Sequence, residues 1–120
     1  MTIDEFIKNA FEIRNQTHFW HLATRLDPEH RALGKFYDSW LDLTDDFIET
    51  FAGKYERPSA GFTCQTLPYS VGASYPYMLK VASFMQSSDL RSIAQDSDLQ
   101  NILDEMTALA NHTAYRLTLV

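Results

Sequence analysis

The sequence predicts an all-α fold, a four-helix bundle that forms a single domain over residues 1–120. Apolar residues recur every three or four positions in four separate segments, which is the pattern of amphipathic helices. Between the second and third of these segments, residues 53–73 interrupt the pattern, with breaks at Pro58, Gly61, Pro68 and Gly72. The chain is 45% apolar and long enough for one hydrophobic core.

The first helix is expected to run from the N-terminus to about Thr24. Thr2 followed by Glu5 three residues later is a capping-box pattern. Trp20 is expected to pack inside the bundle. The apolar face comprises Ile3, Phe6, Ile7, Ala10, Phe11, Ile13, Leu22 and Leu26.

The second helix is expected from Asp27 to Phe51, with its end near Gly53. Asp27 is suited to cap this helix and Pro28 to occupy its first position. The short turn before it makes the first two helices antiparallel. Its apolar positions are Leu33, Phe36, Tyr37, Trp40, Leu41, Leu43, Phe47, Ile48 and Phe51, and a separate acidic stripe holds Asp38, Asp42, Asp45 and Glu49.

Residues 53–73 are too long for a tight turn, and their length suits a crossover between two parallel helices. Their aromatic residues are expected to pack against the bundle, and the single cysteine, Cys64, is expected to be a packed thiol. The third helix should begin near residues 74–76, and the fourth near 96–98. Neither carries a Glu-x-x-His motif, which is typical of metal sites inside di-iron bundles, so the sequence favours a site between subunits or none.

The net charge of −6 argues against a general nucleic-acid-binding protein, which would carry a basic patch. No segment has the length and apolar character of a membrane span, and no signal peptide is visible, so we expect no membrane partner. One cysteine cannot form an intrachain disulfide, and a reducing, cytoplasmic location is expected.

Histidines and carboxylates near the second helix form a candidate ligand set for iron, with zinc and manganese as alternatives. The set comprises His18 and His30 with Asp45 and Glu49, and His21 is a further candidate. His30 and Asp45 are separated by roughly 22 Å along one straight helix, because each residue adds 1.5 Å. They can therefore share a metal only across a two-fold axis, where the start of one helix meets the end of its mate.

The same residues resemble the Dps-type miniferritins of the ferritin-like superfamily. That family has a histidine beside a tryptophan late in the first helix, here His18 with Trp20 nearby. A second histidine follows about a dozen residues later, here His30, and an acid pair four apart lies beyond the middle of the second helix, here Asp45 and Glu49. The resemblance implies a ferritin-like bundle, an iron-oxidising (ferroxidase) site shared by two-fold related subunits, and a homo-oligomer, a dimer at least and twelve subunits in the family.

The resemblance is close over residues 10–55 and weaker over 97–117. Many miniferritins carry another carboxylate one turn after the second histidine, where this chain has Gly34, with Asp38 a further turn on. The Lys-rich tail through which many of them bind DNA is missing, so DNA binding is not expected. A second hypothesis therefore stays open: a ferritin-like oligomeric module without a ferroxidase site, which binds a small ligand or a protein through residues 53–73.

Overall fold

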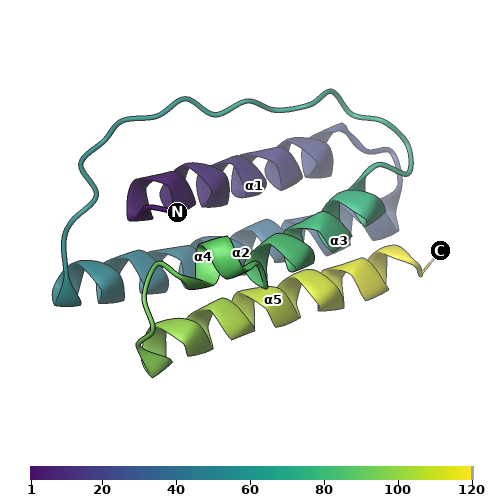
Figure 1. The fold of residues 1–120 in the computed structure, drawn as a ribbon. Helices are drawn as coiled ribbons and strands as arrows, with labels where there is room; N and C mark the ends of the chain where they lie inside the picture. The colour runs from purple at the N-terminus through teal and green to yellow at the C-terminus, as the bar shows by residue number, and fades with distance from the viewer. Residues whose placement is uncertain (120) are drawn as a thin grey trace.

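The computed structural model describes residues 1–119, and the prediction of an all-helical protein is confirmed for them. Figure 1 shows α1 (Ile3–Ala23), α2 (Asp27–Lys54), α3 (Ser74–Met85), the short α4 (Ser88–Arg91) and α5 (Ser97–Leu117). None of these helices is long and apolar enough to span a lipid bilayer.

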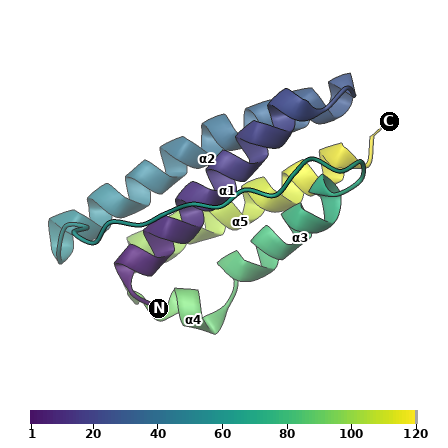
Figure 2. The ribbon, with the colours of Figure 1, turned by 90° about the horizontal axis from the view of Figure 1, so that it is seen from above.

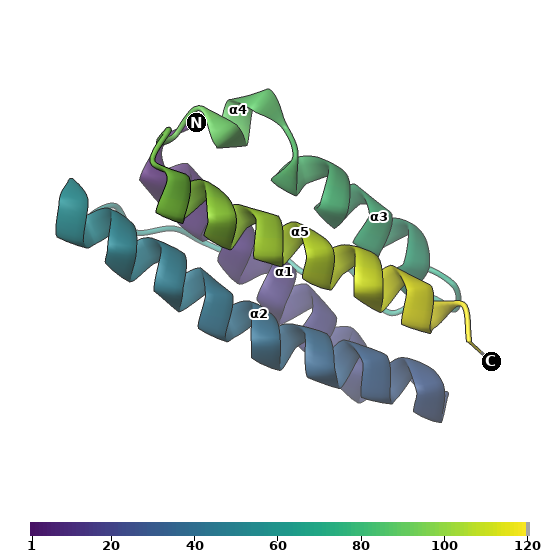
Figure 3. The ribbon, with the colours of Figure 1, turned by 90° about the horizontal axis from the view of Figure 1, so that it is seen from below.

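The four long helices form a bundle in which one pair, α1 and α3, makes few contacts. α2 packs extensively against α1 and α5, and α5 packs against α3, whereas α1 and α3 barely touch. Figures 1 and 3 show that α1 and α5 run in one direction and that α2 and α3 run in the other. The connection between α2 and α3 therefore joins two parallel helices.

The core is centred on the long helix α2. Trp40, Phe36 and Phe47 of α2 are fully buried, and Phe6 of α1 packs against Phe47 with ring centroids 4.8 Å apart. The indole Nε1–H of Trp40 donates a hydrogen bond of 2.9 Å to the carbonyl oxygen of Ala10, so its one polar group is satisfied inside the core.

Residues 56–73, which we call the strap, run along the outside of α1 as an extended segment (Figure 2). The side chain of Gln16 receives a bond of 2.6 Å from the Leu67 amide and donates one of 3.2 Å to the Leu67 carbonyl, and Trp20 Nε1 donates to the Pro68 carbonyl at 3.2 Å. The strap contains no helix.

Several predicted helix ends are confirmed and others are wrong. The capping box of Thr2 and Glu5 is present. Asp27 is not the cap of α2, because Leu26 takes the cap position and the Asp27 carboxylate instead pairs with Arg31 at 2.7 Å. Leu22 and Leu26, expected on the buried face of the first helix, are 67% and 52% exposed. Leu22 lies two residues past the buried Trp20, so it points to another side of the helix, and Leu26 lies beyond the end of α1 at Ala23.

Candidate metal centre

The side chains of His21 and His30 lie face to face where α1 turns into α2. Their ring centroids are 3.8 Å apart at an interplanar angle of 15°. The Nδ1 atom of His21 lies 2.6 Å from the carbonyl oxygen of His30, and the Nδ1 atom of His30 lies 2.7 Å from the carbonyl oxygen of His21. A carbonyl can only accept, so each Nδ1 carries the proton, and in the neutral rings each Nε2 keeps a free lone pair.

This tautomer is the one in which histidine binds metals through Nε2, with the other ring nitrogen held by a backbone carbonyl. The reciprocal pair also ties the last turn of α1 to the first turn of α2. The sequence ranked His21 below His18 as a ligand, because the pairing depends on the geometry of the helix–helix turn and leaves no signal in residue spacing.

Gly34 lies directly beside the ring of His21 in this pair. A β-carbon at residue 34 would lie 2.8 Å from Cε1 of His21 and 2.9 Å from its Nδ1, so any side chain there would force the imidazole to move. The carboxylate that many miniferritins carry here therefore has no room while His21 keeps its place. The glycine that departs from the miniferritin pattern is therefore also the residue that leaves room for the histidine pair.

His18 extends the row of rings along α1. It stacks on Tyr37 with centroids 4.2 Å apart, and its centroid is 6.2 Å from that of His21. Burial, then the charge of Arg14, then His21 lower the pKa of His18, which favours the neutral imidazole that a metal requires. The Arg14 guanidinium lies over the Tyr37 ring at 5.6 Å.

Asp45 and Glu49 lie on the far half of α2 and are exposed. Within the described residues, no three histidine, cysteine or carboxylate side chains come together as a metal-binding group. The structure thus groups His18 with His21 and His30 at one end of the molecule. It leaves the acid pair apart from them on the same chain.

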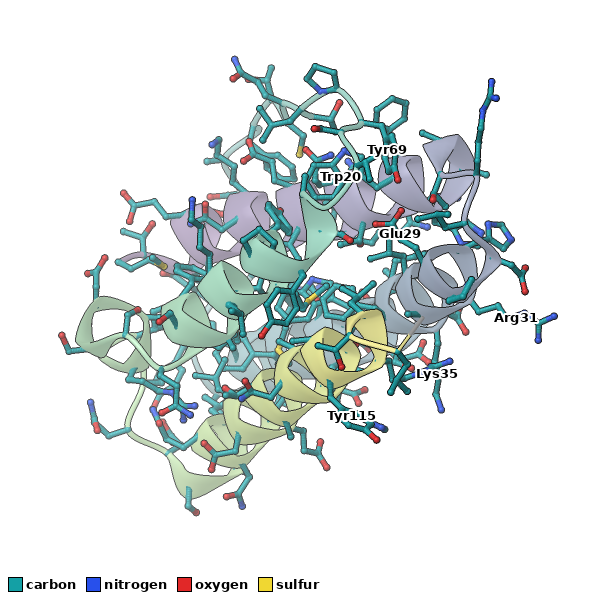
Figure 4. All side chains as sticks on the ribbon, turned by 90° about the vertical axis from the view of Figure 1, so that its right-hand side faces the viewer. Trp20, Glu29, Arg31, Lys35, Tyr69 and Tyr115 are labelled. Carbon is teal, nitrogen blue, oxygen red and sulfur yellow. The ribbon has the colours of Figure 1, made fainter. Side chains whose placement is uncertain are left out.

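The exposed face of α2 carries a straight row of charges. Its members follow steps of four and three residues: Arg31, Lys35, Asp38, Asp42, Asp45 and Glu49, all exposed. Such spacing keeps side chains on one line parallel to the helix axis. We call this row the α2 charge row, and Figure 4 shows its two basic members projecting away from the bundle.

A second polar cluster surrounds Glu29, a residue that the sequence reading did not single out. Glu29 is only 8% exposed, and its two carboxylate oxygens accept hydrogen bonds from the hydroxyls of Tyr69 at 2.6 Å and Ser74 at 2.5 Å. Burial alone would raise the pKa of Glu29, but the bonds from Ser74, Thr24 and Tyr69 outweigh it and lower the pKa. The carboxylate is therefore ionised at neutral pH.

Arg14 and Thr44 flank a hollow between α1 and α2, and each has a buried polar atom without a partner, the Nε and the Oγ1 atom respectively. Three other buried helical threonines, Thr17, Thr107 and Thr113, each donate to the carbonyl four residues earlier. Thr44 makes no such bond.

The fold and the histidine cluster define an all-α bundle protein with a histidine pair at the turn between its first two long helices. The chain belongs to a family of unknown function, DUF5856, whose profile matches residues 21–117. No curated protein and no solved structure matches the chain.

Proposed function

We propose that the protein is a ferritin-like, Dps-type iron-binding protein that oxidises or sequesters Fe(II) at a site shared by two copies of the chain. The ligands are His18 and His30 of one subunit with Asp45 and Glu49 of its mate. The α2 charge row is the observation that carries this proposal, because it is complementary to itself when two chains pack antiparallel.

In an antiparallel pair of helices related by a two-fold axis at residue 40, residue i of one helix lies level with residue 80 − i of the other. Arg31 then meets Glu49 of the mate, and Lys35 meets Asp45. In the metal-free dimer these contacts give four opposite-charge pairs. Only Asp38 and Asp42 meet with like charge, and a bound cation would offset that repulsion.

The same axis brings the histidines to the acids. His30 comes within one residue of the level of Glu49 of the mate, about 1.5 Å along the axis. His18 lies against Tyr37, and the level of Tyr37 is two residues, about 3 Å, from that of Asp45 of the mate. Each half of the dimer would thus place two imidazoles beside two carboxylates, a donor set that suits Fe(II), zinc or manganese.

The arrangement also fits iron chemistry. The carbonyl-bound Nδ1 of His30 leaves Nε2 for the metal, and the exposed carboxylates supply hard oxygen ligands. Bound iron would supply the electron that peroxide or oxygen takes up, and the side chains of this chain hold and orient the metal. A closed storage shell of twelve subunits would be a further step beyond the dimer.

Mixing two defective variants tests the shared site. One variant carries His18→Gln and His30→Gln, and the other carries Asp45→Asn and Glu49→Gln. Neither alone should bind Fe(II) under anaerobic conditions. After reassociation of a 1:1 mixture, each heterodimer regains one of its two sites, so iron binding should return to about a quarter of the wild-type value.

The controls are His112→Gln and Asp46→Asn, exposed residues outside the proposed ligand set, which should bind iron as the wild type does. Peroxide is then added, and the ferric absorbance is followed. Failure of the mixture to regain binding, although both variants fold and associate, would exclude a site shared between subunits.

A further inference from the structure

A hollow of about 360 Å³ opens at the end of the bundle where α2 and α3 begin and α5 ends. Its lining includes Leu26, Val71, Tyr75 and Leu117, with Glu29 and Ser74 as polar members. The volume lies at the lower end of the range for small-molecule sites, so it fits a ligand of modest size. This hollow is separate from the α2 charge row and does not depend on the proposed iron function.

The rim of the hollow exposes large apolar side chains. Leu26, Val71, Tyr75 and Leu119 are 52%, 79%, 41% and 50% exposed. Single exposed apolar residues are ordinary, but several gathered around one concave site are typical of a binding surface. Covering them would remove apolar area from water at roughly 25 cal/mol per Å².

The one charged group in the lining is the Glu29 carboxylate. The Tyr69 hydroxyl donates a hydrogen bond to Oε1 of Glu29 and the Ser74 hydroxyl donates one to Oε2, so each oxygen keeps further acceptor capacity. No Lys, Arg or His side chain of the described chain pairs with it. The hydroxyls thus solvate the negative charge without neutralising it, and Figure 4 shows Glu29 pointing inward near Tyr69.

The helix ends explain why this charge is tolerated and what it would attract. Glu29 lies in the first turn of α2 and Ser74 is the first residue of α3, so two positive helix ends stabilise the carboxylate. The C-terminal end of α5, with its partial negative charge, meets the hollow at Leu117 and Leu119. An apolar wall with one buried anion and a negative helix end is complementary to a cation on an apolar body.

We infer that this hollow binds a small organic cation, a primary amine on an apolar chain or ring, with its ammonium group paired with Glu29. If Glu29 served only to join α2, α3 and the strap, it would need no charge. A neutral amide in its place could also accept hydrogen bonds from the Ser74 and Tyr69 hydroxyls. The hydrogen bonds offset the cost of burying the carboxylate but leave its negative charge, and an ammonium group in the hollow would pair with that charge. Three N–H donors of an ammonium can use the remaining carboxylate lone pairs.

The test uses hexylamine, with 1-hexanol and hexanoate as probes of the same chain length. Binding is followed by amide chemical shifts of Gly72, Tyr75 and Leu117 in the full chain. The amine should bind about tenfold tighter than the alcohol, which corresponds to about 1.4 kcal/mol. Hexanoate should bind more weakly than either.

Glu29→Gln should remove the preference for the amine, whereas Glu105→Gln, which changes an exposed carboxylate outside the hollow and outside the proposed ligand set, should keep it. Val71→Trp fills the hollow from its exposed rim and leaves the Glu29 bonds intact, so it should abolish binding even if the Glu29 variant does not fold. Equal binding of amine and alcohol, undiminished binding to Val71→Trp, or absence of binding by all three probes would overturn the inference. Shifts at these residues that depend on protein concentration without any probe would also overturn it, because a second copy of the chain would then fill the hollow.

Discussion

Gly34 and His21 are in direct contact, and a β-carbon on Gly34 would come within 2.8 Å of Cε1 of His21. The imidazole cannot easily move away, because its Nδ1 is bonded to the His30 carbonyl and its ring is stacked on that of His30. A glycine inside a helix normally lowers stability relative to alanine. At this position it instead preserves the histidine pair.

Gly34→Ala should therefore lower the free energy of unfolding. Overpacking costs about 1–3 kcal/mol, which matches or exceeds the roughly 1 kcal/mol that alanine gains in helix propensity. Gly53 provides the matched control, because it lies in α2 with nothing within 4 Å of its β-carbon. Gly53→Ala should raise stability, and His21→Ala/Gly34→Ala should lose the penalty of the clash. Chemical denaturation measures all three, and a gain for Gly34→Ala alone would contradict the contact.

Thr44→Val should leave stability unchanged or raise it by about 1 kcal/mol. The Oγ1 atom of Thr44 is buried without a partner, and replacement by a methyl group of the same shape removes an unsatisfied polar group. Thr113→Val is the control, since the Thr113 hydroxyl donates to the Leu109 carbonyl at 2.8 Å. That change should cost about 1 kcal/mol. Thermal or urea unfolding of the pair measures the difference, and equal losses would mean that the Thr44 hydroxyl is satisfied in solution.

Glu29→Gln should reduce the dependence of stability on acid pH. The folded pKa of Glu29 is below its ordinary value of 4.5, so near that pH the unfolded chain binds more protons than the folded chain. The stabilisation is therefore complete above about pH 4.5 and is lost as the pH falls through the lower folded pKa. In the variant, the free energy of unfolding should be lower at pH 7 and fall less below pH 4.5, measured by urea unfolding across the range. A wild-type profile in the Glu29 variant would show that its carboxylate does not carry this dependence.

The periodic pattern predicted the helices because core burial of residues such as Trp40 decides where they form. It failed at Leu22, which lies on another side of α1 from the buried Trp20, and at Leu26, which lies beyond the end of α1 at Ala23. It also missed Glu29, because an acid in a first helical turn is typical of solvent-exposed caps, and its partners Tyr69 and Ser74 come from the strap and from α3, far along the chain. The stacking of His21 depends on the turn between two helices, which spacing along one helix cannot specify.

Charge reversal along the α2 charge row tests the antiparallel dimer apart from metal. Arg31→Glu/Lys35→Glu makes the row entirely acidic, and Asp45→Lys/Glu49→Lys makes both of its ends basic, so each variant alone should repel itself and stay monomeric in EDTA at low salt. Mixed in equal amounts, the two should form a heterodimer, because each reversed charge meets its opposite at level 80 − i.

The control is Lys8→Glu/Lys80→Glu, which changes the net charge as much as the first variant does but lies on α1 and α3. Sedimentation velocity should show that this control associates as the wild type does. Raising the salt to about 0.5 M should weaken the heterodimer, because exposed pairs are screened at that ionic strength. If the mixture stays monomeric while the wild type dimerises, the chains meet through another face, and the proposed ligands of two subunits do not come together.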